Sequence, residues 1–379
     1  MKNKPETQHV LALLFVAFIS VFAVLFWAIP DKTFSEQENR YLQEFPDFSF
    51  EALFEQGWTK DFETYMTDQF PGRDSWVGLK SLSEYTLGKR ENNGVYFGKD
   101  GSLLQDYQGG ANLEKNAEYV QRFHDLVKVP VFFGLIPDSI WIKQAQLPAF
   151  SLEHNQQDAL QAVENMLTFP TIPIAQTLQQ HAAEEMLYYK TDHHWTMQGA
   201  YYGYTAIMEA LGQAPLPEQA FQKRMLSSNF SGTLQAKSGA WWISPDILEG
   251  WQPLSAPNPQ IQIYDGDTLL LTLESYFSYP RLDTRDQYSV YLDGNHSKVI
   301  IHTGNEDGKN LLLIKDSFGH ALAPLLSAHY SQIHMVDLRY YKTDYINYIL
   351  QHDIDEVLIL YSVNTFSQDS NLVFLTAGY

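Results

Sequence analysis

The sequence predicts an α/β protein: a three-layer α/β/α arrangement around a parallel sheet, with a β-rich insertion and one N-terminal transmembrane helix. Three observations carry this prediction. Short, continuously apolar runs alternate with amphipathic segments on both sides of residues 213–300. Residues 213–300 themselves lose the helical period and are rich in Pro, Trp, Tyr and Ser. Residues 10–29 form one long uncharged apolar run.

The apolar run at residues 10–29 predicts a membrane anchor. About 20 helical residues, each rising about 1.5 Å, span a hydrocarbon core about 30 Å thick. Basic residues precede the run and acidic residues follow it, which predicts an N-terminus inside the cell and the remaining chain outside. These flanking residues are Lys2, Lys4, Asp31, Glu36 and Glu38. A cleaved signal peptide is the alternative, although the run is longer than a usual signal core and no small-residue cleavage motif follows it.

The anchor divides the chain into four expected parts. Residues 1–9 form a cytoplasmic tail and residues 10–29 the anchor. Residues 30–105 form a juxtamembrane stalk and entry region. Residues 106–379 form the main domain, which includes the β-rich insertion at about residues 213–300.

Composition excludes several classes of function. Lys and Arg number 25 against 45 Asp and Glu, giving a formal net charge of −20, and this charge repels phosphate backbones. Nucleic acid is therefore not an expected partner. The chain has no cysteine, which excludes disulfides, thiolate zinc sites and cysteine nucleophiles. We expect no cofactor.

The first half of the main domain alternates helix and strand. Apolar residues at helical spacing predict helices, and short apolar runs between them predict buried strands. The expected order is helix 113–127, strand 131–136, helix 157–167, strand 172–175, helix 176–186, and a helix after residues 191–195 that Gly212 closes.

The alternation resumes after the insertion. Within the insertion, residues 268–273 and 288–292 have the composition of strands. The elements expected after it are strand 310–314, helix 318–329, strand 333–336, helix 344–351 and strand 357–361. Parallel sheets bind ligands beyond the carboxyl ends of their strands, and Ser139, Ser317 and Asn364 fall just past such ends.

Ser317 is the first candidate for chemistry. It follows an apolar strand and opens a helix, so its Oγ is expected near N–H groups and a positive dipole end that stabilise a developing oxyanion. The alternative is that Asp316 and Ser317 only cap the helix.

The run Asp192-His193-His194-Trp195 is the second candidate. A nucleophilic serine needs a base, and the base needs an acceptor that fixes its tautomer. An Asp two residues before a His, at a turn entering a helix, supplies that pair. One alternative is a helix cap beside two structural histidines; another is a metal site of Asp192, His193 and His194. Adjacent histidine side chains diverge and no further ligand follows at a useful spacing, so we expect no metal.

Further polar residues lie near Ser317 in the expected fold. Asn364 follows a strand and can donate its amide to an oxyanion, or it is simply a turn residue. Lys315, His320 and Arg339 either bind an anionic glycan or form solvated ends of helices and strands.

The order of these elements matches a known arrangement. From residue 310 the chain gives strand–Asp-Ser–helix, strand, helix and strand–x-Asn; from residue 112 it continues through helices and strands to Asp-x-His. That is the block order of the SGNH/GDSL hydrolase fold begun in the middle, so the sequence resembles a circular permutant of it. Four motifs also resemble those of the DHHW proteins of Gram-positive bacteria, which are similar to the permuted SGNH-like domains of the AlgX and AlgJ alginate O-acetyltransferases. The motifs are DHHW (192–195), KDSFGHALAPLL (315–326), VDLRYY (336–341) and SEQENRYL (35–42).

The resemblance implies roles for individual residues. Ser317 would be the nucleophile, His194 the base and Asp192 the residue that orients the base. Asn364 matches the oxyanion position by its place after a strand. A backbone N–H of Arg339 or Tyr340 would replace that of the family's second-block glycine, which has no clear match in this sequence.

The resemblance also implies an activity. The chain would be an extracytoplasmic O-acetyltransferase or acetylesterase acting on hydroxyls of a cell-surface or secreted polysaccharide. Such proteins usually work beside a membrane-bound O-acyltransferase that supplies acetyl groups. The alternative class is a catalytically inactive glycan-binding or scaffold protein, since Lys315 stands where the family has the glycine of Gly-Asp-Ser. A metal-dependent hydrolase is a third class.

Overall fold

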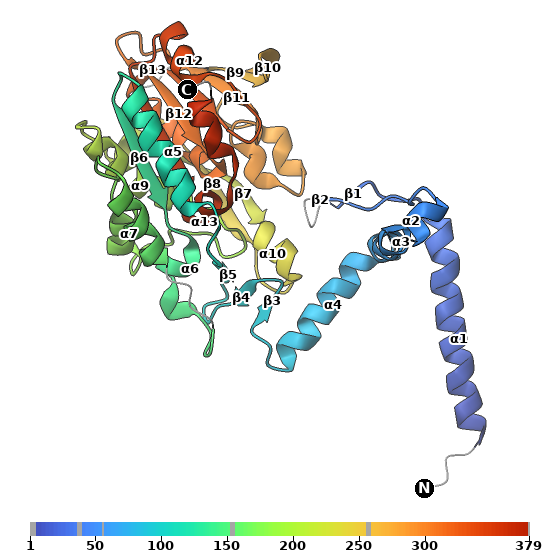
Figure 1. The fold of residues 1–379 in the computed structure, drawn as a ribbon. Helices are drawn as coiled ribbons and strands as arrows, with labels where there is room; N and C mark the ends of the chain where they lie inside the picture. Colours follow the sequence, from blue (N-terminus) through green and yellow to red (C-terminus); the bar gives the residue numbers. More distant parts are fainter. Residues whose placement is uncertain (1–4, 36–39, 55–56, 152–155, 255–258, 378–379) are drawn as a thin grey trace. The chain divides into compact units, whose positions relative to one another are not determined.

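The computed structural model describes residues 5–35, 40–54, 57–151, 156–254 and 259–377 (Figure 1). The chain divides into two units: residues 1–89 with 239–241, and residues 90–238 with 242–379. Most of the charges that predict the orientation of the anchor lie outside the described residues, as does part of the motif at residues 35–42. These charges are Lys2, Lys4, Glu36 and Glu38.

The first unit is mainly helical. Helix α1 (Pro5–Ala28) contains a segment, Gln8–Ala28, that is long and apolar enough to cross a membrane. Most apolar side chains of that segment are exposed, as a lipid-facing helix requires. The other elements are β1 (Phe34–Ser35), β2 (Arg40–Tyr41), α2 (Phe50–Phe54), α3 (Gly57–Asp68) and α4 (Arg73–Thr86).

The second unit contains a mixed seven-stranded sheet of order β10-β9-β11-β13-β12-β14-β6. Four strands are parallel to one another: β6 (Val131–Ile136), β12 (Lys309–Lys315), β13 (Tyr330–Val336) and β14 (Glu356–Ser362). Three strands run antiparallel to their neighbours: β9 (Gln260–Asp265), β10 (Thr268–Leu273) and β11 (Lys298–His302).

The expectation of a wholly parallel sheet is therefore wrong in part. Strands β9 and β10 are joined by a tight turn at Gly266, and so short a connection permits only antiparallel pairing. Through β11 they extend the main sheet, so residues 260–265, 268–273 and 298–300 of the expected insertion belong to that sheet. The remaining strands of the segment, β7 (Phe221–Phe230) and β8 (Asp246–Pro253), pair with each other.

Helices cover both faces of the central strands. Leu311 and Leu313 of β12 pack among residues of α8 (Ile174–His181) and α9 (Met197–Ala210). Leu312 and Ile314 point to the other face, where they pack among residues of α5 (Leu113–Leu126), α7 (Gln156–Met166) and α12 (Tyr345–Gln351). This alternation explains why the strand is continuously apolar.

Most predicted elements are confirmed, and three are wrong. Residues 172–175 form no strand: Ile172 makes one isolated bridge to Gly134, and α8 begins at Ile174, directly after a proline. Residues 288–292 are largely a 3₁₀ helix, η4 (Gln287–Val290). The single helix expected at 318–329 is a 3₁₀ turn, η5 (Ser317–Leu322), followed by the short helix α11 (Ala323–Leu326), because Pro324 fits only the first turn of a helix.

The remaining elements of the second unit are short. They are β3 (Glu91–Asn92), β4 (Val95–Phe97), β5 (Leu103–Gln105), α6 (Ser139–Ile142), η1 (Gln144–Gln146), η2 (Glu218–Ala220), α10 (Thr233–Ser238), η3 (Tyr279–Asp283), α13 (Val363–Gln368) and η6 (Asn371–Thr376).

Candidate active site

Ser317 lies directly beyond the carboxyl end of β12, in a turn that Asp316 holds. One carboxylate oxygen of Asp316 accepts a hydrogen bond from the N–H of Phe318 (3.0 Å), and the other accepts one from the N–H of Ser362 (2.8 Å). Asp316 therefore caps η5 and fastens it to the end of β14. Ser317 itself lies in this turn and is half-buried, so part of the residue is accessible to solvent.

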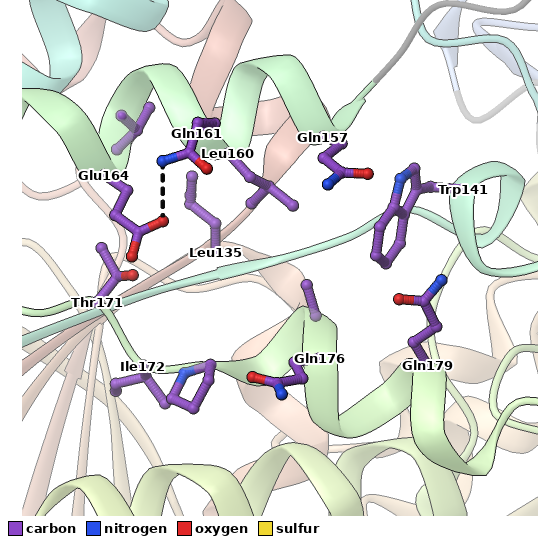
Figure 2. Close-up of a pocket in the computed structure, with 13 residues that line it drawn as sticks. Leu135, Trp141, Gln157, Leu160, Gln161, Glu164, Thr171, Ile172, Gln176 and Gln179 are labelled. Carbon is purple, nitrogen blue, oxygen red and sulfur yellow. Dashed lines mark hydrogen bonds between the residues drawn. The ribbon is translucent and has the colours of Figure 1, made fainter.

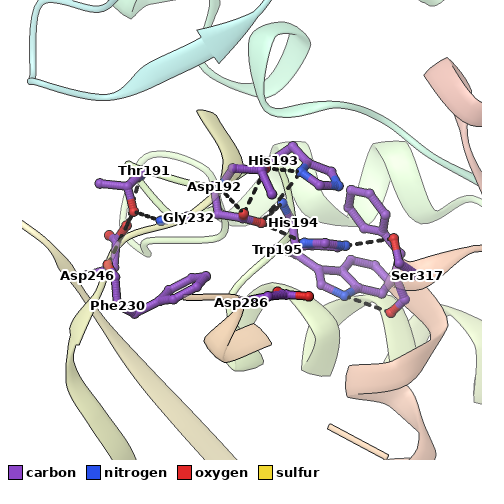
Figure 3. A network of polar contacts seen from close by, with 12 residues as sticks. Thr191, Asp192, His193, His194, Trp195, Phe230, Gly232, Asp246, Asp286 and Ser317 are labelled. Carbon is purple, nitrogen blue, oxygen red and sulfur yellow. Dashed lines mark hydrogen bonds and ion pairs between the residues drawn. The ribbon is translucent and has the colours of Figure 1, made fainter. Parts of the chain in front are cut away.

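The structure joins the two predicted motifs, which are 123 residues apart in sequence, in one hydrogen-bonded array (Figure 3). Nε2 of His194 lies 2.8 Å from Oγ of Ser317, and Nδ1 of His194 lies 2.6 Å from Oδ1 of Asp192. A carboxylate oxygen only accepts, so Nδ1 carries the proton and Nε2 of the neutral imidazole accepts from the serine hydroxyl. This is the arrangement that a serine nucleophile and its base require.

The Asp192 side chain is held from several directions. Oδ1 accepts from the backbone N–H of His194, and Oδ2 accepts from the N–H (2.8 Å) and hydroxyl (3.0 Å) of Thr233. Burial alone would raise the pKa of Asp192, but its electrostatic interactions with His193 and His194 and the two hydrogen bonds from His194 hold it well below its usual range. The Asp192 carboxylate is therefore ionised, so it can stabilise the positive charge of an imidazolium if His194 takes up a proton from Ser317.

Two residues that sequence reasoning missed fit closely around this array. Gly232 packs against Asp192 so tightly that a Cβ at this position would lie 2.2 Å from the Asp192 Cβ. The Tyr288 ring stacks on the His194 imidazole, with centroids 3.7 Å apart and planes inclined by 6°. Neither position carries a local signal in the sequence, because both lie far along the chain from residues 192–195.

The loop that carries Asp192 is fixed by Asp246, the first residue of β8. Its carboxylate accepts from the N–H groups of Lys190 and Thr191 and from the Thr191 hydroxyl. The same hydroxyl accepts from the N–H of Gly232 (3.0 Å). Strand β8 therefore holds the loop that carries Asp192 and His194.

The predicted oxyanion residues are Asn364, Arg339 and Tyr340, and they differ in whether their N–H groups are already hydrogen-bonded. Asn364 is the second residue of α13, and its Oδ1 accepts from Gln368 (2.9 Å); within the described chain no hydrogen bond engages its amide nitrogen. The backbone N–H groups of Arg339 and Tyr340 both bond to Asp337. They are thus already engaged, and an oxyanion role for them stays a prediction.

Of the three basic residues expected near Ser317, Lys315 and His320 are buried rather than solvated, whereas Arg339 is partly exposed. Nζ of Lys315 lies 2.6 Å from Nε2 of His320, and both side chains are almost fully buried. Burial lowers the pKa of Lys315 to about 8. The side chain of Arg339 is 33% exposed and forms a two-point ion pair with the buried Asp337, so its guanidinium is paired with a carboxylate.

The metal alternative concerns the same residues. One ligand atom from each of Asp192, His193 and His194 lies within 4.8 Å of the others, so the three could hold an ion. However, both ring nitrogens of His194 are engaged in the array, and Nδ1 of His193 bonds to the Thr233 hydroxyl (2.8 Å). Metal binding would therefore compete with the contacts that align Ser317.

Fold and site together define the class: a mixed α/β protein with a serine–histidine–aspartate array at the carboxyl edge of its sheet. The chain belongs to the DHHW protein family, whose sequence model matches residues 127–336. That range contains Asp192, His194 and Ser317.

Comparison with known proteins agrees with this assignment. The chain is 27% identical over 217 residues to AlgJ of Pseudomonas syringae pv. tomato, a probable alginate O-acetylase; the match covers 51% of this chain and spans about half (54%) of that relative. A DHHW family protein from Eubacterium siraeum has a similar structure (TM-score 0.66, 23% identity, 75% of this chain and 95% of that one). PatB1 of Bacillus cereus, in a structure with a sulfonyl adduct, is also similar (TM-score 0.63, 21% identity, 74% and 99%). The structural likenesses establish the shared fold.

Proposed function

We propose that this protein is a membrane-anchored, extracytoplasmic O-acetyltransferase or acetylesterase that acts on hydroxyls of a cell-surface or secreted polysaccharide. The observation that carries the proposal is the array of Ser317, His194 and Asp192, with separations of 2.8 and 2.6 Å. The acetylase activity in the name of the AlgJ relative supports the choice of acetyl groups and a polysaccharide.

The proposed reaction has two halves. First, Nε2 of His194 takes the proton of the Ser317 hydroxyl while Oγ attacks the carbonyl carbon of an acetyl donor; the leaving oxygen of the donor takes that proton, and acetyl-Ser317 remains. Second, His194 takes the proton of a glycan hydroxyl whose oxygen attacks the acetyl carbon, and the proton returns to Ser317 Oγ. Water in place of the glycan gives an esterase. The ionised Asp192 stabilises the imidazolium in both halves.

The proposal also covers the fold, the division of the chain, the oxyanion donor and the source of acetyl groups. We propose a circularly permuted SGNH-like, three-layer domain over residues 106–379, a stalk over residues 30–105, the anchor at residues 10–29 and a cytoplasmic tail at residues 1–9. The Asn364 amide nitrogen is the side-chain donor proposed for the oxyanion. A membrane-bound O-acyltransferase is the proposed source of acetyl groups, because a site outside the cell needs a donor that reaches it across the membrane.

The test uses the full chain in detergent with 4-nitrophenyl acetate, and it follows ester hydrolysis and the intact mass of the protein. We expect an acetyl adduct in the wild type, none in Ser317→Ala, and loss of activity by a factor of at least about 10³ in both Ser317→Ala and His194→Ala. His193→Ala is the matched control and should retain most activity. Activity that chelators abolish and added metal restores would instead indicate a metal-dependent hydrolase. Absence of any adduct would indicate a scaffold.

A further inference from the structure

A cavity of about 300 Å³ lies beside β6, between α7 and α8 (Figure 2). This volume is at the lower end of the range for ligand pockets. None of its 13 lining residues belongs to the Ser317 array. The cavity is therefore a separate feature of the second unit.

The floor of the cavity is apolar, and its rim is polar. Leu135 of β6, Val163 of α7 and Ile172 are buried core residues that close the bottom. The rim carries four glutamines, which are Gln157, Gln161, Gln176 and Gln179. A floor that belongs to the packed core holds its shape, while the rim amides are accessible to a ligand.

The lining matches the chemistry of a sugar. Each amide offers both donors and acceptors, as do the hydroxyls of a sugar ring. The side-chain amides of Gln176 and Gln179 make no hydrogen bond to another described residue, so they are available to a ligand. The half-buried Trp141 indole lies at one end of the cavity, beside Gln157 and Gln179 (Figure 2), where an aromatic face can pack against sugar C–H groups.

The charge of the lining limits the ligand further. Glu164 is the single charged side chain among the lining residues, and none of them is basic. An anionic sugar would meet this carboxylate with no cation to offset it, in a chain whose net charge is −20. The cavity therefore favours an uncharged sugar over a uronate or a phosphorylated sugar.

The cavity also lies along a strand that leads to the reactive edge of the sheet. Trp141 belongs to α6, which follows the carboxyl end of β6. Strands β6, β14 and β12 are consecutive and parallel, so their carboxyl ends share one edge, and Ser317 follows β12 there. Two strand spacings place β6 about 10 Å from β12.

We infer that this cavity is a binding subsite for an uncharged polysaccharide, which holds one part of the acceptor chain while another part reaches Ser317; the inference rests on the proposed function for the identity of the acceptor. Trp141 supplies the stacking face, and Gln176 and Gln179 bind the hydroxyls. The substrate class is therefore a neutral glycan.

The test measures binding of oligosaccharides to the full chain in detergent by titration calorimetry. The neutral probes are cellohexaose, maltohexaose and laminarihexaose, and the anionic probe is hexagalacturonate. We expect at least one neutral hexasaccharide to bind and hexagalacturonate not to bind. Trp141→Ala should weaken binding at least about tenfold, as loss of a central aromatic contact does. Gln179→Ala should weaken it several-fold, whereas Gln180→Ala, an exposed neighbour on α8 outside the lining, should not.

The acetyl adduct is measured on the same samples, so a failure of the subsite can be distinguished from a failure of the proposed function. The melting temperature of Trp141→Ala is also measured, to check that the variant is folded. Binding that is lost in Trp141→Ala and kept in Ser317→Ala supports the subsite, even if no adduct forms and the proposed function fails. An adduct without binding of any neutral probe overturns the subsite alone. Preference for hexagalacturonate, or neutral binding that Trp141→Ala and Gln179→Ala leave unchanged, also overturns it.

Discussion

The indole nitrogen of Trp195 donates a hydrogen bond of 3.2 Å to the backbone carbonyl of Phe318. Each partner directly follows a member of the proposed catalytic array, His194 or Ser317. Trp195 is fully buried, and its ring packs so closely on Gly203 of α9 that a Cβ there would lie 2.7 Å from it. This contact therefore links the segment that carries His194 to the segment that carries Ser317.

Trp195→Phe should lower both stability and activity, because it keeps an aromatic ring but removes the donor. The Phe318 carbonyl then loses its buried partner, which costs about 1–3 kcal/mol of unfolding free energy. We expect kcat for 4-nitrophenyl acetate to fall about tenfold or more as His194 and Ser317 lose their alignment. Chemical unfolding and steady-state kinetics measure the two effects, and an unchanged kcat would contradict the positioning role.

Gly232→Ala should abolish most activity by displacing Asp192. The new Cβ would lie 2.2 Å from the Asp192 Cβ and 2.5 Å from its Oδ2, closer than atoms can approach. The matched control is Gly101→Ala, where no atom lies within 4 Å but φ is +80°, so it should lose about 1–2 kcal/mol of stability and keep its kcat. Equal kcat in both variants would show that the position of Asp192 is unimportant.

Tyr288 provides a test of how the His194 ring is held. Tyr288→Phe keeps the stacked ring and should retain nearly all activity, since the buried Tyr288 hydroxyl has no hydrogen-bond partner among the described residues. Tyr288→Leu removes the planar face and should lower kcat about tenfold or more with little change in KM. If Tyr288→Phe were the more damaging substitution, the hydroxyl rather than the ring would carry the function.

Asp138, just beyond the end of β6, gives a pH dependence of stability. Burial, together with the charge of Asp316, raises the pKa of Asp138 to about 7, although hydrogen bonds from Gln156 and Asn364 oppose the shift. The folded protein therefore keeps a proton that the unfolded chain releases from about pH 4 upward. The contribution of this proton to the free energy of unfolding is fully present below pH 4 and is lost as the pH rises to about 7.

Asp138→Asn should remove this dependence, because the amide cannot ionise. Relative to the variant, the wild type should lose stability between pH 5 and pH 7, by at most about 1.4 kcal/mol per pH unit, with no further divergence above pH 8. Melting temperatures of both proteins across pH 5–8 provide the measurement. Parallel curves would mean that Asp138 is already ionised at pH 5.

The absence of cysteine from the sequence permits a clean test of membrane orientation. Asn165→Cys, at an exposed position in the second unit, should react with a membrane-impermeant maleimide on intact cells. Asn3→Cys, before the anchor, should react only after permeabilisation. The reverse pattern would contradict an N-terminus inside the cell, and a shortened chain lacking the label at position 3 would indicate a cleaved signal peptide.

The sequence by itself determined the central framework of this protein. Strands β6, β12 and β14 were predictable because each contains a short run of consecutive apolar residues, as a strand buried on both faces requires; this signal lies within a few residues. Ser317 and the Asp192–His194 pair were predictable for a similar reason: each lies in a short motif at the boundary of a helix.

Only the tertiary structure decided how these strands and motifs are brought together with the other residues around them. The antiparallel pairing of β11 with β9 and β13, the stacking of Tyr288 on His194 and the fit of Gly232 against Asp192 depend on contacts between residues far apart in the sequence. The cavity beside β6 likewise draws its lining from three separate segments of the chain. Such contacts leave no local period or motif, because the burial that stabilises each residue is provided by distant parts of the chain.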